Sequence, residues 1–353
     1  MCDAMKTLTS RRKQRSRHAM RGMSLVELMI AITLGMMILA GVIGIFSATS
    51  SSRSEIERTS RQIENGRYAM EMLTDDLKLA GFHGELNMGL VATPAALPDP
   101  CSTTVTDWSS AVPLHLQGYD NGGTPPSCIG SSLKSNTDII AVRRVRGCTT
   151  VTPGCATAAT GSPYIQVSQC ATDPSTTPFV LGLYGTATYS LRKKDCATAA
   201  PLREYLVRTY FISTDNGAGQ SIPTLKRREM TGSTTVEVPL VEGIEYLQFV
   251  YGIDNTGDGL PDAYTADPGT YTYAGCTNCT PVNNWTNVMT VQVYLLARNI
   301  DTSPGYTDTK TYNLGIDAVG NAVSVGPFND GYRRHVYASV VRIANAAGRR
   351  DTP

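Results

Sequence analysis

One apolar stretch near the amino end constrains this chain more than any other feature. Leu28 to Phe46 gives 19 residues without a charge. As an α-helix this run would extend about 28 Å, close to the roughly 30 Å hydrocarbon core of a bilayer. Glu27 lies directly before it, although a carboxylate at mid-bilayer costs roughly 2.5–3.5 kcal/mol on insertion scales. The sequence therefore predicts a membrane-spanning helix that keeps a carboxylate near its start.

The residues before this span are basic. Seven Lys or Arg and one acid, Asp3, precede Met23. Such a flank orients a single span with its amino end in the cytoplasm. A cleaved secretory signal would have an apolar region of only about 7–15 residues, followed by its cleavage site. The longer apolar run, with a candidate processing site ahead of it at Gly22/Met23, favours a retained anchor.

The rest of the chain is mildly acidic. Beyond the basic flank, 24 basic and 29 acidic residues leave a balance of −5, which argues against binding to phosphate backbones. We therefore expect no nucleic-acid partner. Only His83, His115 and His335 lie beyond the flank, and no HExxH, GxSxG, P-loop or GxGxxG pattern is present. The sequence predicts a protein that is not an enzyme.

A helical pattern continues well beyond the membrane segment. No proline occurs between Met23 and Gly81, and the composition becomes polar after Phe46. Five apolar residues then recur at helical spacing: Ile56, Ile63, Met70, Leu73 and Leu77. This spacing predicts one apolar face. We expect a single helix ended by Gly81, with its second half packed against a globular body.

The body is predicted to consist mainly of strands. Segments rich in β-branched and aromatic residues alternate with Gly, Pro, Asn and Ser clusters. The expected strands are 138–143, 164–168, 186–191, 203–213, 236–239, 243–251, 288–297 and 334–343. We predict an α+β fold, a long N-terminal membrane-spanning helix packed on an antiparallel β-sheet domain. Its parts would be a basic leader at 1–22, a helix at 23–81 with its membrane half at 23–46, and a body at 82–353.

Eight cysteines lie beyond the span: Cys101, Cys128, Cys148, Cys155, Cys170, Cys196, Cys276 and Cys279. An even set beyond a membrane anchor indicates oxidation in the periplasm or outside the cell. Many pairings are open to eight cysteines, and sequential pairing of near neighbours is the default. Zinc is the alternative for the last two, but no second CxxC and no nearby His accompany them. A small disulfide-closed turn is therefore favoured there.

A second chemical motif lies between residues 254 and 262. Its candidate Ca²⁺ ligands are Asp254, Thr256, Asp258, the Leu260 carbonyl and Asp262. Aspartates at loop positions 1, 5 and 9, with Gly259 at position 6, resemble a calcium loop. Position 12 is Thr265 rather than the usual bidentate Glu. The other interpretation is an Asp/Gly turn between strands, so both hypotheses stay open.

The start of the span resembles a known signal. Gly22, then Met23, then Glu27 at the fifth position after Gly22, ahead of a long apolar helix, resemble the class III signal of type IV pilins and type II secretion pseudopilins. Met23 stands where this family usually has Phe. Three further stretches, at 66–84, 251–264 and 332–345, resemble the PilW family of minor pilins.

The resemblance implies a processing and assembly route. A prepilin peptidase would cut after Gly22 on the cytoplasmic side, and Met23 would become the N-methylated first residue. The protein would wait in the inner membrane with its body in the periplasm, and would then enter a pilus at the cell surface. Its expected partners are other minor and major pilins, contacted through the N-terminal helix, and a tip adhesin. The expected place of action is an initiating or tip complex.

Glu27 has two interpretations. A carboxylate near a helix N-terminus is favourable to the helix dipole, which explains its tolerance in a monomer but not its spacing from the new amino end. Alternatively, Glu27 neutralises the amino terminus of an adjacent subunit. Small-xxx-small spacing at Ala31/Gly35 and Ala40/Gly44 would allow helices to approach closely.

Two other functions stay open. The nearest is a minor pseudopilin of type II secretion, which shares the processing signal. A more distant one is a membrane-anchored periplasmic binding protein that never polymerises. The Gly22 signal and Glu27 count against the second, because such a protein needs neither.

Overall fold

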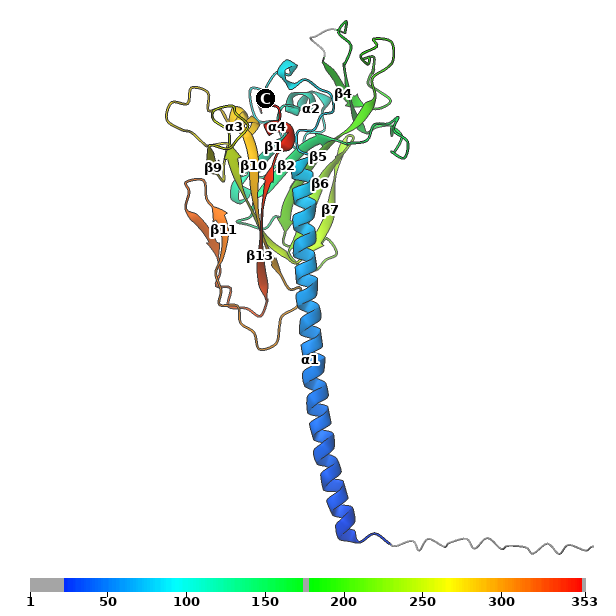
Figure 1. Cartoon of the computed structure of the whole chain (residues 1–353), viewed down its shortest axis with the longest axis vertical. Helices are drawn as coiled ribbons and strands as arrows, with labels where there is room; N and C mark the ends of the chain where they lie inside the picture. The colour runs from blue at the N-terminus through cyan, green and yellow to red at the C-terminus, as the bar shows by residue number, and fades with distance from the viewer. Residues whose placement is uncertain (1–21, 174–177, 351–353) are drawn as a thin grey trace, which may run out of the picture. The chain divides into compact units, whose positions relative to one another are not determined.

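The computed structural model describes residues 22–173 and 178–350 (Figure 1). It contains one long helix, α1 (Leu25–Lys78), as the absence of proline predicted. The chain divides into two compact units between Glu55 and Ile56, so that α1 contributes a segment to each unit. The basic flank at 1–21 lies outside the described residues.

The second unit is built from antiparallel strands. The larger sheet contains β1 (Leu116–Tyr119), β2 (Ile139–Val145), β3 (Pro163–Val167), β4 (Phe179–Leu183), β5 (Leu202–Ser213), β6 (Thr224–Thr231) and β7 (Thr234–Glu242). A second sheet contains β8 (Ile244–Ile253), β9 (Ala263–Thr265), β10 (Val288–Arg298) and β13 (Arg334–Arg342), and a hairpin pairs β11 (Tyr312–Ile316) with β12 (Ala322–Val325). This confirms the α+β class.

The order of strands places β5 and β10 at the centres of the two sheets. The larger sheet runs β1-β2-β5-β3-β4, with β6 also on β5 and β7 on β6. The second sheet runs β13-β10-β8-β9. Two short helical segments, η1 (Met88–Leu90) and α2 (Val105–Ala111), lie between α1 and β1. Two more connect strands, η2 (Asp120–Gly122) and α3 (Pro281–Thr286), and α4 (Ala344–Ala347) follows β13.

The main core lies between the second half of α1 and both sheets. Ala69, Leu73 and Leu77 of α1 share one buried cluster with residues of β2, β5, β8 and β10. The predicted apolar face was only partly right, because Ile56 and Ile63 are 67% and 43% exposed. The buried residues of α1 are Gln62, Gly66, Ala69, Leu73, Thr74, Asp76 and Leu77. A small or polar residue therefore takes several inward positions where a large apolar one was expected.

One predicted strand, at 186–191, was wrong. The strand in this region is β4 (Phe179–Leu183), and the chain then turns at Gly185, which has a φ of +94°. A φ in that range favours glycine. Tyr189 Oη then donates to the carbonyl oxygen of Gly182 at 2.7 Å, so the segment folds back over β4 through a side chain. Thr186, Thr188 and Ser190 are exposed and Leu191 is buried, so the β-branched and aromatic composition of 186–191 does not mark a strand of the sheet.

The charged strand β6 (Thr224–Thr231) was missed by the sequence analysis. Its pairs lie on the neighbouring strand and loop: Lys226 Nζ is 2.9 Å from carboxylate oxygens of both Asp215 and Glu237. Arg228 contacts the second Glu237 oxygen at 2.8 Å. These pairs neutralise the charges between adjacent strands. A charged segment can therefore form a strand here, although it lacks the alternation of apolar and polar residues from which strands were predicted.

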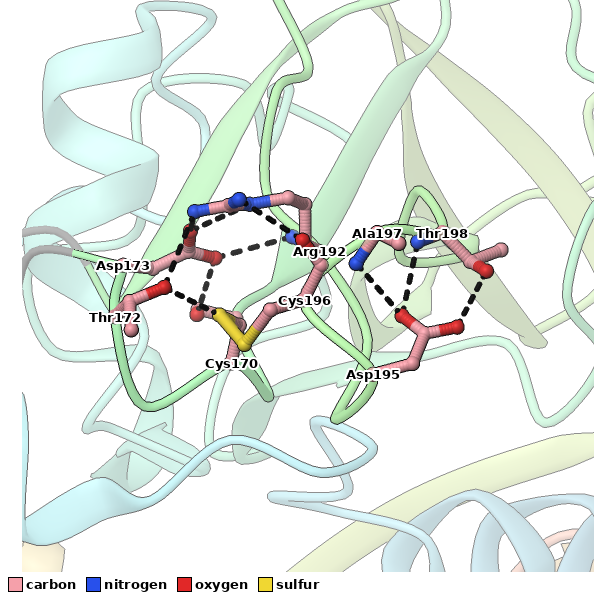
Figure 2. Close-up of a disulfide and its surroundings, with 9 residues drawn as sticks. Cys170, Thr172, Asp173, Arg192, Asp195, Cys196, Ala197 and Thr198 are labelled. Atoms are coloured by element: carbon pink, nitrogen blue, oxygen red, sulfur yellow. Dashed lines mark hydrogen bonds and ion pairs between the residues drawn. A yellow bond between two sulfur atoms is a disulfide. The ribbon is translucent and has the colours of Figure 1, made fainter.

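All eight cysteines beyond the span form disulfides, and the default of sequential pairing is confirmed. The pairs are Cys101–Cys128, Cys148–Cys155, Cys170–Cys196 and Cys276–Cys279. Figure 2 shows the third pair beside an ion pair between Arg192 and Asp173, whose closest atoms are 2.8 Å apart. Arg192 also donates to the Cys196 carbonyl at 2.9 Å. The disulfide and Arg192 thus tie the same two loop segments together.

A buried arginine holds the segment between β10 and β13. The side chain of Arg334 is 0% exposed, and its guanidinium contacts Glu245 at 2.6 Å, Asp308 at 2.9 Å and Asp330 at 2.7 Å. The β11–β12 hairpin of this segment covers the face of the second sheet around Leu296 and Tyr294. The two faces of that sheet are therefore covered by α1 and by the hairpin.

Candidate functional site

The amino end of α1 is closed by a reciprocal pair of hydrogen bonds. The Ser24 amide donates to Glu27 Oε2 at 3.0 Å, and the Glu27 amide donates to Ser24 Oγ at 3.3 Å. This is a capping box, which satisfies two backbone donors at a helix start. Gly22 and Met23 lie immediately before it, outside the helix. The three residues singled out from the sequence are thus grouped at one helix terminus.

Only one oxygen of the Glu27 carboxylate takes part in that box. Among the described residues, no hydrogen bond or ion pair engages Oε1. The carboxylate therefore caps its own helix and still has an acceptor free. The helix-dipole interpretation and the assembly interpretation of Glu27 are compatible in this geometry, since they use different oxygens.

The first half of α1 exposes its apolar side chains on every side. Every residue from Met23 to Ser52 is exposed, including Leu25 at 75% and Phe46 at 74%. An apolar surface of this extent is far larger than a soluble monomer presents. This helix is the one candidate membrane span among the described residues. Its apolar surface requires lipid or other helices as its environment.

Small residues interrupt that apolar surface. A side chain built at Gly35, Gly41 or Gly44 would meet no heavy atom within 4 Å. Within this unit these glycines are therefore not required for packing. They leave shallow positions on the helix surface where another helix can approach closely.

The second half of α1 is attached to the strands by polar side chains that the sequence analysis missed. Gln62 Nε2 donates to the Ala297 carbonyl at 2.8 Å and to the Arg333 carbonyl at 3.0 Å. Asn65 Nδ2 donates to the Glu242 carbonyl at 3.1 Å. Their signal was present, because Gln62 falls on the 3–4 spacing that leads to Leu73 and Leu77. An amide on an otherwise small and apolar stripe indicates a buried polar contact.

Asp76 is the most constrained charge on α1. Its residue is 4% exposed, and its Oδ1 contacts Arg144 of β2 at 2.6 Å and Arg208 of β5 at 3.1 Å. Tyr210 donates to Oδ2 at 2.7 Å. Burial and the charge of Asp76 raise the pKa of Tyr210, so the phenol stays a donor. Asp76 therefore joins the helix to two strands of the larger sheet.

Two buried histidines lie where the chain leaves α1. The His83 Nδ1 donates to the Gly81 carbonyl at 3.0 Å, and His115 Nε2 donates to the Val288 carbonyl at 2.8 Å. Burial lowers the pKa of His83 to about 4 and that of His115 to about 3. Both imidazoles are therefore neutral at physiological pH, as packed side chains rather than acid–base groups.

The candidate calcium loop is closed by donors from the protein itself. The Asp254 carboxylate accepts from the amides of Thr256, Gly257 and Gly259 and pairs with Arg350 at 3.0 Å. The carboxylates of Asp258 and Asp262 each accept backbone amides of the loop, from Leu260 for the first and from Asn255 and Thr256 for the second.

Because each of these carboxylates is bonded to the loop's own amides, they are not grouped around a common position for a metal ion. Within residues 22–173 and 178–350 there is no group of three His, Cys, Asp or Glu side chains that could hold a metal ion. The donor set is that of an Asp/Gly turn, and it does not fit a calcium cage in this arrangement. Calcium binding stays a prediction, which calorimetry with Ca²⁺ and an Asp258→Ala control would test.

Two family models match the chain. A prokaryotic N-terminal methylation motif matches residues 17–43, which include Gly22, Met23 and Glu27. The family described as type IV pilus-assembly protein W, PilW, matches residues 209–345, from β5 through α4. No curated protein and no solved structure gives a significant match.

These findings define the class of protein. A methylation motif at an exposed apolar helix, followed by a helical segment packed on antiparallel sheets, is the organisation of a membrane-anchored type IV pilin. The match over the strands of the second unit is to a narrower family than the methylation motif is. Over residues 209–345 the chain is similar to the PilW family of type IV pilus-assembly proteins, and its amino-terminal motif agrees with that similarity.

Proposed function

We propose that this protein acts in the initiating or tip complex of a type IV pilus, together with other minor pilins. The observation that carries the proposal is the amino end of α1, where an exposed apolar helix begins with a carboxylate that keeps one oxygen free. The match to a pilus-assembly family supports an assembly role. Nothing in the described residues favours the type II secretion alternative over it.

Processing would convert the segment from an anchor into an assembly element. Prepilin peptidase would cut between Gly22 and Met23 at the cytoplasmic face of the inner membrane. Before the cut, the basic flank holds the amino end in the cytoplasm, and the disulfide-bonded body lies in the oxidising periplasm. After the cut, the methylated amine of Met23 is the new positive end of the helix.

Glu27 would then pair with the amino terminus of a neighbouring subunit. In a low-dielectric bundle of helices an unpaired amine and an unpaired carboxylate are both costly. Bringing the amine of one subunit to the free Oε1 of the next removes both costs at once. The capping box on Oε2 keeps the carboxylate near the helix axis while this happens.

The Glu27→Gln variant tests this step. Glutamine at the third helical position also forms a capping box, so this change removes the charge and keeps the cap. We expect normal cleavage and N-methylation, seen by mass spectrometry of the mature amino end. We expect at least a tenfold loss of the protein from sheared pili, measured by immunoblot.

Ser24→Ala is the matched control. It removes the other half of the capping box while leaving the carboxylate, so incorporation should stay close to wild type. If the Glu27→Gln protein entered pili as efficiently as the wild type, the proposed charge pairing would be wrong. An intact leader on the wild-type protein would remove the pilin route as a whole.

A further inference from the structure

A cleft at one end of the second sheet is lined by asparagines. It is formed by α3, by the loop that follows β8 and by the disulfide-closed turn at Cys276–Cys279. Its volume is about 300 Å³, and five of its lining residues are Asn255, Asn278, Asn283, Asn284 and Asn287. We call it the asparagine cleft.

Part of this amide content serves the fold. Asn284 is 4% exposed, and its Nδ2 donates to the carbonyls of Pro268 and Tyr271, both at 2.8 Å. Asn283 Nδ2 donates to the Asn278 carbonyl at 3.1 Å. These bonds hold the walls of the cleft together, so its shape is set before any ligand arrives.

The remaining amide groups have unused hydrogen-bonding capacity. Asn255 uses its Nδ2 on Tyr271 Oη, and Asn287 uses its Oδ1 to accept from Arg350. Among the described residues, no partner engages Asn255 Oδ1, Asn283 Oδ1 or Asn287 Nδ2. The whole side-chain amide of Asn278 is likewise without a partner there. Asn284 Oδ1 also has no partner among the described residues, so the asparagines of the cleft contribute three free acceptors, one free donor and one complete free amide.

The chemistry of the lining selects the ligand. No Asp, Glu, Lys or Arg lines the cleft, so neither a metal ion nor a phosphate has a charge partner in it. An amide presents a donor and an acceptor in one plane, which suits neighbouring hydroxyl groups. Tyr273 is 39% exposed at the rim and offers an apolar ring face with a polar tip.

We propose that the asparagine cleft binds a neutral saccharide residue. The cavity is at the lower end of the range for small-molecule sites, which suits one or two sugar rings. Few apolar atoms line it, so we expect dissociation constants on the order of millimolar. The binding does not depend on the assembly role of α1, since the cleft lies wholly within the second unit.

Saturation-transfer NMR on the full chain tests the proposal. The protein is held in a polyoxyethylene detergent, because sugar-headed detergents would compete. The probes are glucose, galactose, N-acetylglucosamine and maltose, with glucuronate as the charged comparison. We expect saturable transfer to the ring protons of at least one neutral sugar.

Substitutions at two exposed residues test whether the cleft is the sugar-binding site. Asn278→Ala removes an amide that lines the cleft and has no internal side-chain bond, so the fold should be unaffected; we expect about a tenfold weaker interaction. Thr272→Ala changes an exposed residue of the same loop that does not line the cleft, and binding should be unchanged. No transfer to any neutral sugar, equal effects of the two variants, or binding of glucuronate alone would overturn the proposal.

Discussion

The two halves of α1 are the same helix in opposite environments. From Leu25 to Glu55 the side chains are almost all exposed, and most are apolar through Phe46. From Ile56 to Lys78 the inward face carries a glutamine, a glycine and an aspartate among its buried residues. The apolar half must therefore find its environment outside the chain, while the polar half finds its environment within it.

This difference separates assembly from folding. Changes in the first half should alter incorporation and leave the stability of the second unit unchanged. Changes in the inward face of the second half should do the reverse. Each of the following variants either sharpens this separation or breaks it.

The largest effect is expected from Asp76→Asn. The change leaves Arg144 and Arg208 without their shared carboxylate in a buried position. Removing one partner of a buried ion pair costs about 3–5 kcal/mol of unfolding free energy. Chemical denaturation followed by the fluorescence of Trp108 and Trp285 measures it.

Asp75→Asn is the matched control for Asp76. Asp75 is the preceding residue, its side chain is 64% exposed, and its contact is a surface pair with Lys78. Its loss should change the unfolding free energy by less than about 0.5 kcal/mol. Equal effects of the two substitutions would show that the Asp76 contacts contribute little to stability.

The second effect is a loss of stability in acid, to which buried His115 contributes together with His83, which lies just beyond the end of α1. The pKa of His83 is about 4 in the folded chain and about 6.5 when unfolded. Below pH 6.5 the unfolded chain binds the extra proton, so stability is full above that pH and falls as the pH drops toward 4. The shift corresponds to about 3 kcal/mol.

Denaturation midpoints measured from about pH 7 to about pH 4 give the slope of the unfolding free energy against pH. His83→Gln should make the slope shallower, because glutamine does not titrate, while His115 maintains part of it. His335→Gln, which removes an exposed histidine of β13, should leave the slope unchanged. An unaltered slope in His83→Gln would mean that another group causes the acid sensitivity.

The smallest effect compares two glycines of α1. A methyl group at Gly66 would come 2.2 Å from Tyr337 Cε2, whereas one at Gly35 would meet nothing within 4 Å. Overpacking costs about 1–3 kcal/mol, so Gly66→Ala should lower the unfolding free energy by that amount. Gly35→Ala should leave it unchanged and reduce recovery in sheared pili, if close helix approach is needed.

Tyr337→Leu tests the cause of the Gly66 effect. Combined with Gly66→Ala, it should restore part of the lost stability, because the ring that the methyl group meets is gone. A loss of stability in Gly35→Ala as large as that in Gly66→Ala would break the separation between the two halves.

Several elements were predictable because their signals are local. The membrane helix follows from 19 uncharged residues, and β5 and β13 follow from alternation within single segments. The disulfides follow the order of the cysteines. In contrast, β6 and the non-strand at 186–191 depend on partners elsewhere in the chain, namely Glu237 for β6 and Gly182 for the other.

The inward face of α1 shows the same limit. Helical spacing alone permits several neighbouring stripes, and the largest apolar residues, Ile56 and Ile63, suggested the wrong one. The strands select the stripe in which Gly66 leaves room for Tyr337 and Gln62 reaches the Ala297 carbonyl. Side-chain size could not reveal this, because close approach requires the absence of a side chain.

By itself, the sequence determined one span, a helix that continues beyond it, and a carboxylate at the fifth position after Gly22. These are properties of consecutive residues, and hydropathy and helix propensity add along the chain. Only the tertiary structure decided that Asp76 meets Arg144 and Arg208, which lie 68 and 132 residues away. Only it gathered the asparagine cleft, because burial and pairing arise from contacts between segments that share no local pattern.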